Sequence, residues 1–265
     1  MRCTEVLRTE LSCSPSRFGC AHSNTQLFGV SQWRCCSDLL FLLLHRLPWA
    51  VFFTVIHVCH VWHSTSTYGA SVPMFYLYYS YWGELLTMLD TLLGLVVAII
   101  IQHGYLKTWH LLLSVYWILH NVSAWTTLIV VLSYWALHYP GTQPSFFNIV
   151  GHVMIGVYII LDTMVSAIPM RLQHGYQGTI VALVYVIFNY CYFLSGGRNP
   201  FQDSQATTYP YLDWDVDPGM AFLKGLAVVA VGVILWIFLY GVYVIRMCIF
   251  SRYHKDIDPE WTEIP

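Results

Sequence analysis

Two residues have side chains suited to nucleophilic catalysis, and both lie inside long apolar runs. Thr87 carries a hydroxyl and His152 carries an imidazole. A hydroxyl is a weak nucleophile until a base within hydrogen-bond reach takes its proton. Histidine suits that role because its unperturbed pKa lies near 6.5. If the two side chains meet, they could attack a substrate that lives among lipids, such as a lipid ester.

Both residues also have structural interpretations. A threonine in a membrane-spanning helix commonly donates its hydroxyl proton to the carbonyl four residues earlier, here that of Gly83. A buried histidine such as His152 can simply bridge two helices. The sequence identifies neither an oxyanion hole nor a third group that would orient His152, so these alternatives stay open.

Two carboxylates lie in the same apolar surroundings. An ionisable group at membrane depth costs roughly 2.5–3.5 kcal/mol on insertion scales, and such groups often mark sites. Asp90 follows Thr87 by three positions, so it shares roughly the same helix face and could line the same cavity or accept a hydrogen bond from a tyrosine. Asp162 is expected near the membrane midplane, with Asn189 or a tyrosine as a plausible partner. Structural use is the favoured interpretation of both carboxylates.

Three histidines, His57, His60 and His63, recur at a spacing of three. This spacing could suggest a metal or haem site, but residues three apart over two steps do not stay on a single helix face. We therefore favour polar lining or interface positions over metal ligation. The sequence predicts neither a metal nor another cofactor.

The composition indicates which elements must position these residues. The 265-residue chain is 57% hydrophobic and 10% charged, whereas soluble domains are close to 25% charged. Its net charge of −2 gives no electrostatic case for binding nucleic acid. We expect an all-α, polytopic transmembrane bundle of about six spans. The expected helices are 47–62, 83–101, one within 111–137, 146–169, 178–196 and one between 224 and 246. They form a membrane domain at 46–249, between terminal tails 1–45 and 250–265.

The basic residues predict how the bundle is oriented. Of the 12 Lys and Arg residues, ten fall on the side of the termini, and only Arg198 and Lys224 fall on the other. Excess positive charge marks the cytosolic side, so both termini are expected in the cytosol. Thr87 then lies about 6 Å below Gly83 at 1.5 Å per residue. His152, which follows Phe147 on a helix entered from the same side, lies at a similar depth.

The N-terminal tail holds five of the eight cysteines. No continuous apolar stretch typical of a signal peptide is seen there, so the first spanning helix is expected to direct insertion. A cytosolic tail favours reduced thiols over disulfides. Cys35 and Cys36 precede an apolar run, which makes palmitoylation an alternative fate for them.

Several short motifs resemble those of the rolling stone family of multi-pass membrane proteins. They are SQWR at 31–34, YWGELLT at 81–87, VYWILHN at 115–121, GGRNP at 196–200 and YPYLDW at 209–214. The most specific is the last pair, whose loop motif contains Tyr209, Pro210, Asp213 and Trp214. The resemblance covers about residues 20 to 250. It implies a plasma-membrane protein, and the family's founding member is associated with myoblast fusion.

The chain is more remotely similar to the androgen-induced-gene family of six-span proteins. Members of that family hydrolyse fatty acid esters of hydroxy fatty acids with a membrane-embedded threonine and histidine. Their T-x-x-D element is similar to residues 87–90 here, and their histidine that opens the fourth span is similar to His152. The resemblance therefore implies Thr87 and His152 as a catalytic pair. Trp82 is displaced by one position from the remote family's pattern, and the flanking loops differ in length.

Three functional hypotheses follow. The first is a rolling stone-type protein of the plasma membrane, rather than the endoplasmic reticulum, that acts in cell–cell fusion or membrane organisation. The second is an intramembrane hydrolase of lipid esters that uses Thr87 and His152. The third and weakest is a transporter or channel whose flux depends on Asp162. The expected partners are the lipid bilayer and a lipid-ester substrate, and the sequence indicates no protein partner.

Overall fold

The protein is an all-α bundle, which confirms the predicted fold class. The computed structural model describes residues 15–20, 22, 24–33, 37–69, 71–104, 110–138, 145–199, 208–209 and 211–253. Within these ranges, six helices are long and apolar enough to cross a membrane. The six candidate spans are Asp38–Thr67, Tyr79–Gln102, His110–Leu137, Phe146–Val165, Leu172–Leu194 and Pro218–Tyr253.

The first span begins earlier than the sequence suggested. It comprises α2 (Asp38–Phe41), the π-helical turn η3 (Leu42–Arg46) and α3 (Leu47–Tyr68). The hydroxyl of Ser37 accepts a hydrogen bond from the Leu40 N–H at 3.2 Å and so caps the helix. The π turn ends two residues before Pro48, which has no backbone N–H to donate. Because the helix starts at Asp38 instead of near Leu47, Arg46 lies within the span.

The other spans stay close to their expected positions, apart from the last. They are α5 (Tyr79–Gln102), α6 (His110–Ser133) with the π turn η5 (Tyr134–His138), and α7 (Phe146–Ile149) with η6 (Val150–Met154) and α8 (Ile155–Val165). The fifth is α9 (Gly175–Leu194), preceded by η7 (Leu172–His174). The last, α10 (Pro218–Tyr253), has 36 residues and is longer than the charge-free interval used to predict it. Its start is capped by Asp217, whose carboxylate accepts a hydrogen bond from the Met220 N–H at 2.9 Å.

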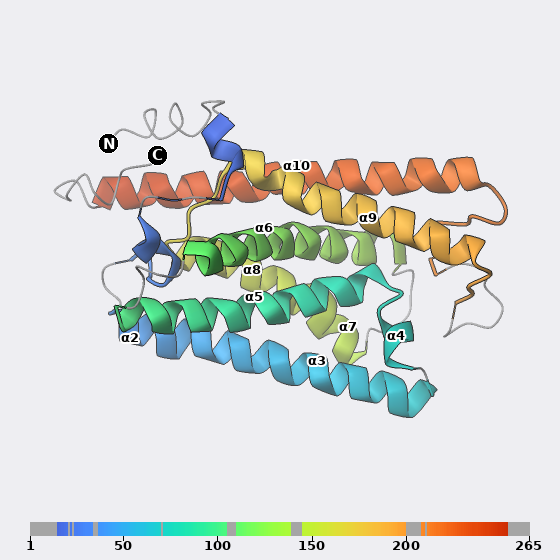
Figure 1. Ribbon diagram of the computed structural model, residues 1–265, viewed down its shortest axis with the longest axis horizontal. Coiled ribbons are helices and arrows are strands. Elements are labelled where there is room, and N and C mark those ends of the chain that lie inside the picture. Colours follow the sequence, from blue (N-terminus) through green and yellow to red (C-terminus); the bar gives the residue numbers. More distant parts are fainter. Residues whose placement is uncertain are drawn as a thin grey trace.

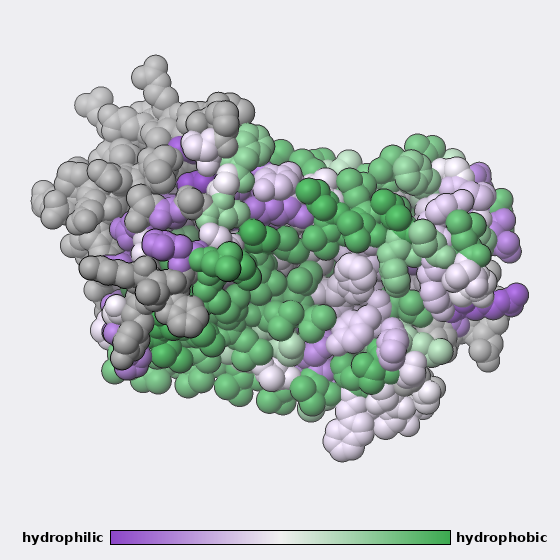
Figure 2. All heavy atoms as spheres, viewed as in Figure 1, coloured by the Kyte–Doolittle hydropathy of each residue, from purple (hydrophilic) through white to green (hydrophobic). Residues whose placement is uncertain are grey.

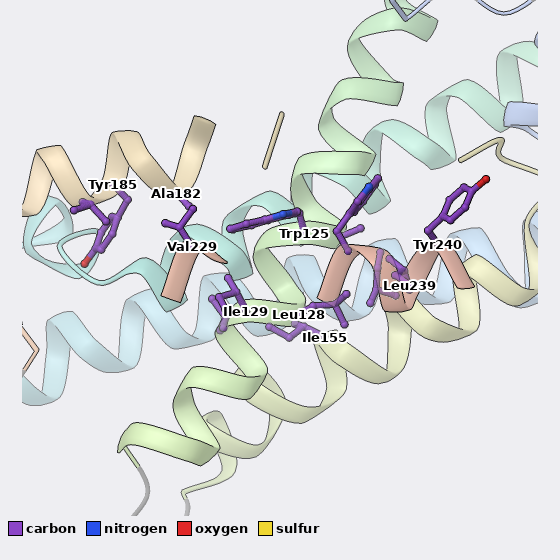
Figure 3. Packing of buried hydrophobic residues seen from close by; sticks show 14 of the residues in the cluster. Trp125, Leu128, Ile129, Ile155, Ala182, Tyr185, Val229, Leu239 and Tyr240 are labelled. Carbon is purple, nitrogen blue, oxygen red and sulfur yellow. The ribbon is translucent and has the colours of Figure 1, made fainter. Parts of the chain in front are cut away.

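The core of the bundle is centred on α6, the most buried of the six spans. In Figure 1, α6 lies between α5 on one side and α9 and α10 on the other. Figure 3 shows Trp125 of α6 among side chains from α9 and α10. Its indole ring lies against Gly178 of α9 and Gly232 of α10, where a Cβ atom would overlap it. These two glycines therefore allow α9 and α10 to pack closely on α6.

Both described ends of the chain lie at the same end of the bundle, which we call the termini end (Figure 1). There the N-terminal segment packs against the residues that follow α8. Ser31 and Ser166 form an isolated antiparallel β-bridge, and the Gln32 N–H donates to the Val165 carbonyl at 2.9 Å. Arg171 donates to the Gly19 carbonyl at 2.8 Å. The described residues of the N-terminal segment thus pack against the bundle.

The opposite end, which we call the loop end, carries the short helix α4 (Val72–Phe75) between α3 and α5. Phe75 is fully buried there and stacks on Tyr81 with ring centroids 3.6 Å apart. Between the two ends, large apolar side chains dominate the visible surface (Figure 2). Val58, Ile187 and Ile234 are each more than half exposed. Such a band of exposed apolar side chains is what a bilayer would cover.

Candidate functional site

A cavity of about 370 Å³ lies at the loop end of the bundle. The ends of α3, α5, α6 and α7 form one side of it, and α9, α10 and the segment before α10 form the other. Its polar and aromatic lining comprises His60, Ser64, Tyr78, Tyr79, Ser80, Tyr81, Ser133, Tyr134, Asn148, His152, Tyr185, Asn199, Thr208, Tyr209 and Tyr211. Its size falls within the range of small-molecule sites, so we call it the loop-end cavity and treat it as the candidate site.

His152, one member of the predicted pair, lines this cavity. It lies on the π turn η6, a type of irregularity that recurs at functional sites. Its Nδ1 is 2.9 Å from the carbonyl oxygen of Asn148, and its ring stacks on Tyr134 with centroids 3.7 Å apart. Because a carbonyl only accepts hydrogen bonds, Nδ1 must carry the proton. The imidazole is therefore held in one tautomer and one orientation at the cavity wall.

Thr87, the other member, is fully buried on α5 and faces α6. Its hydroxyl donates to the Gly83 carbonyl at 2.8 Å, as the structural interpretation predicted. The hydroxyl of Thr127 lies 3.1 Å from it, and Ser123 donates to it at 3.4 Å. Among the described residues, His152 is not one of its hydrogen-bond partners, and Thr87 is not part of the cavity lining. Their catalytic pairing remains a prediction.

Helix α5 and the π turn η6 do pack together, as the depth estimate implied. The α5 residue at the contact is Glu84: a Cβ placed on Gly151 would lie 3.6 Å from its Oε2. Glu84 precedes Thr87 by three positions. Depth counting thus gave two elements that do pack together, but it could not find which residue of α5 lies at their contact.

Glu84 is the chemically important residue that the sequence analysis missed. It is 2% exposed, and each of its oxygens meets one imidazole of α3. Its Oε1 lies 3.2 Å from His57 Nδ1, and its Oε2 lies 2.8 Å from His60 Nδ1. His60 also lines the cavity. The cost of placing a carboxylate inside an apolar helix, which singled out Asp90 and Asp162, would have singled out Glu84 as well.

Asp90 and Asp162 lie in a buried ionic network farther from the loop end. Arg46 donates to Asp162 at 2.9 Å, and His45 Nε2 lies 2.7 Å from the same oxygen. His120 connects the two carboxylates, with Nδ1 3.2 Å from Asp90 and Nε2 3.9 Å from Asp162. Neither aspartate is among the described residues that line the loop-end cavity. The arrangement indicates that they hold helices together.

The partners expected for these aspartates were right in one case and wrong in the other. Tyr158 donates to Asp90 at 3.4 Å, which confirms a tyrosine partner. Asn189 is not the partner of Asp162, because its side-chain oxygen accepts a hydrogen bond from the Trp214 indole at 2.8 Å. The early start of the first span explains the error, since it brings Arg46 to Asp162.

The loop motif before α10 is largely buried. Trp214 is 3% exposed, and the Tyr209 hydroxyl accepts a hydrogen bond from the Tyr79 N–H at 2.9 Å. Burial raises the pKa of the Tyr209 phenol, so it stays neutral. Asp213 accepts hydrogen bonds from the N–H groups of the two residues that follow Trp214. Pro210, like Cys35 and Cys36, lies outside the described residues.

The three histidines of α3 do not act together. His57 and His60 bind Glu84, whereas His63 stacks on Phe147, with centroids 5.2 Å apart, and its Nδ1 lies 3.2 Å from the Thr67 hydroxyl. In the part of the chain that the structure describes, no group of three or more His, Cys, Asp or Glu side chains is arranged to hold a metal ion.

Comparison with known proteins identifies the family. The profile of the family described as Protein rolling stone matches residues 5–258. Protein rolling stone of Drosophila melanogaster is 26% identical over 253 residues, which cover 89% of each chain. No solved structure matches. Together with six helices able to cross a membrane, the match along nearly the whole sequence shows that this chain is a multi-pass membrane protein of the rolling stone family.

Proposed function

We propose that the protein acts at the plasma membrane, in cell–cell fusion or in organising the membrane there. The observation that carries this proposal is the family match over residues 5–258, since the rolling stone resemblance implies such a role. The predicted orientation places the loop end outside the cell. A protein that joins two cells must present a defined surface on that side.

The turn before α10 is a suitable surface. Asp213 accepts hydrogen bonds at 3.1 and 3.2 Å from the N–H groups of Asp215 and Val216, which fixes the turn. Trp214 anchors it through its bond to Asn189. The side chains of Asp215 and Val216 are exposed, and Val216 is 81% exposed. An exposed apolar residue on a rigid acidic turn is a feature that a protein partner could bind.

A cell-mixing assay tests the proposal. Two cell populations express the protein, each with one half of a split fluorescent reporter, so that fluorescence measures fusion. We expect the wild type to raise the number of fused cells and the pair Asp215→Ala, Val216→Asp to reduce it at least severalfold. Thr87→Ala serves as the control with an intact turn, and surface biotinylation verifies delivery of each variant to the plasma membrane. Wild-type protein at the surface without added fusion would refute the fusion role.

A second candidate function is the hydrolysis of lipid esters. The observation in its favour is that His152, held in a single tautomer, lines a cavity large enough for a small ligand. Its imidazole could act there as a general base. The proposed nucleophile, Thr87, would first have to exchange its bond to Gly83 for one to His152. Ser133, whose side chain already lines the cavity, is the alternative nucleophile.

Labelling with a fluorophosphonate probe in detergent-solubilised membranes separates these possibilities. The hydrolase hypothesis with the predicted pair requires wild-type labelling that is lost in both Thr87→Ala and His152→Ala. Labelling that survives Thr87→Ala but is lost in Ser133→Ala would assign the nucleophile to Ser133. A known serine hydrolase serves as the positive control. If it reacts with the probe and the wild-type protein does not, this activity towards the probe is excluded and His152 is a structural residue.

A further inference from the structure

We propose that the loop-end cavity binds an uncharged amphiphile with a hydroxyl-rich headgroup, such as a monoacylglycerol, and that His60 accepts a hydrogen bond from one of its hydroxyls. This inference is independent of the fusion role and of catalysis by Thr87 or His152. It rests on the orientation of His60, on polar groups without partners, and on the charge and size of the cavity.

Glu84 fixes which nitrogen of His60 is available to a ligand. The Nδ1 of His60 lies 2.8 Å from Glu84 Oε2, and Glu84 is held from its other side by His57. A carboxylate only accepts hydrogen bonds, so Nδ1 of His60 carries the proton, and in the neutral imidazole Nε2 is then the acceptor. Phe147 stacks on the ring with centroids 4.6 Å apart and fixes its plane. The result is an imidazole of fixed orientation among the residues that line the cavity.

Other polar groups of the cavity lining have no partner in the described part of the protein. Thr208 is 3% exposed, and its hydroxyl is buried without a hydrogen bond. The side chains of Ser133 and Asn148, both half-buried, also line the cavity and make no hydrogen bond to described residues. Buried polar groups in folded proteins nearly always have a partner. The buried hydroxyl of Thr208, together with the half-buried side chains of Ser133 and Asn148 around the same space, therefore points to a ligand with hydroxyls of its own.

The charge of the lining argues against an ionic headgroup. Among the described residues that line the cavity there is no Lys, Arg, Asp or Glu. A phosphate or carboxylate would therefore lose its hydration without gaining a permanently charged Lys or Arg as its counter-ion, which is unfavourable. A headgroup of neutral hydroxyls loses much less and finds both donors and acceptors. The lining therefore selects neutral over charged amphiphiles.

The remaining wall of the cavity is apolar and suits the start of an acyl chain. It comprises Ile129, Val130, Ala182, Val186, Leu212, Gly225, Val228 and Val229. The volume of about 370 Å³ falls within the range of small-molecule sites. That is room for a glycerol headgroup and the first part of a chain. The polar groups come from α3, α5, α6, α7, η6 and the segment before α10, whereas the apolar wall comes mainly from α9 and α10.

A photoaffinity experiment on the purified full-length protein in lipid nanodiscs tests the proposal. The probe is a monoalkylglycerol with a diazirine and an alkyne on its chain, whose ether linkage a hydrolase cannot cleave. We expect labelling that unlabelled monoacylglycerol competes away and that a fatty acid and lysophosphatidic acid do not. His60→Ala should lower labelling at least tenfold, and His63→Ala on the same helix should leave it unchanged, because His63 is not part of the lining.

Thr208→Val tests the proposal with a variant whose loss of labelling cannot be attributed to misfolding. The substitution keeps the shape of the side chain but removes a buried hydroxyl that has no protein partner, so the melting temperature should be unchanged or higher. Labelling should nevertheless fall severalfold. Ala182→Phe, which fills the cavity, should abolish it. Failure of the wild type to be labelled, equal competition by charged lipids, or full labelling of Ala182→Phe would each overturn the proposal, whatever the fusion assay shows.

Discussion

The guanidinium group of Arg46 donates a hydrogen bond to the carboxylate of Asp162 across 2.9 Å, and both side chains are buried inside the bundle. The pair joins the first span to the fourth. His45 reinforces it at 2.7 Å from the same carboxylate oxygen. An ion pair in such surroundings is costly to break, because removal of one partner leaves the other charge buried and unpaired.

Arg46→Met should therefore destabilise the protein by about 3–5 kcal/mol, the range for breaking a buried pair. Asp162→Leu should cost a similar amount. The double variant should cost clearly less than the sum of the two, because it leaves neither charge unpaired. Unfolding in detergent micelles, followed by circular dichroism, measures all three. Additive effects would show that the two side chains are not energetically coupled.

The contact of Trp125 with two glycines predicts a steric effect. Gly178→Ala and Gly232→Ala would each push a methyl group into the indole ring, so each should destabilise the protein by about 1–3 kcal/mol or more. Gly241→Ala on α10 is the matched control, since a Cβ there would meet nothing within 4 Å. That control should be neutral or stabilising by about 0.5–1 kcal/mol, because alanine favours helices. Equal effects at Gly232 and Gly241 would contradict this account of the core.

His22 at the termini end should make stability depend on pH. Burial beside the rings of Phe28 and Trp117, and secondarily the charge of Arg171, lowers the pKa of His22 from 6.5 to about 4. Below pH 6.5 the unfolded chain binds a proton at this residue that the folded protein does not. Stability should therefore fall as the pH drops from about 6.5 to about 4, and it should not depend on His22 above that range.

The comparison of wild type with His22→Gln isolates this effect from other titrating groups. Melting temperatures measured between pH 7.5 and pH 4.5 should decline more steeply for the wild type than for the variant. The difference in slope should correspond to no more than one proton. Parallel curves for the two proteins would mean that His22 is as accessible to protons in the folded protein as in the unfolded chain.

Trp214 and Asn189 predict an asymmetry between two substitutions. Trp214→Phe removes the donor and leaves the buried amide oxygen of Asn189 without its partner, which should cost about 1–3 kcal/mol. The double variant Trp214→Phe, Asn189→Leu removes both polar groups and should recover part of that loss. Limited proteolysis of the loop before α10 would report whether the turn becomes more accessible in the variants that lose stability. No recovery in the double variant would indicate that ring packing on Tyr190, rather than the hydrogen bond, anchors Trp214.

The sequence alone identified the architecture for a clear physical reason. A spanning helix needs about 20 apolar residues, and this requirement is met locally, so each of the six spans could be found without knowing its neighbours. Helix ends were harder to predict. The first helix expected from the sequence, 47–62, omits residues 38–46, which are continuous with α3. Span counting predicted that Thr87 and His152 lie at a similar depth, and their elements α5 and η6 do pack together.

The tertiary structure decided how each helix is rotated, and therefore which of its residues contact each neighbouring helix. Each residue rotates the helix by about 100°, so Glu84, Thr87 and Asp90, all buried on α5, meet different partners. Glu84 meets the histidines of α3, Thr87 meets Thr127 of α6, and Asp90 meets His120. These pairings cannot be predicted from hydropathy, because they depend on how the six helices pack against one another. The loop-end cavity has the same origin, since it is lined by residues from His60 to Val229 that only the packed bundle brings together.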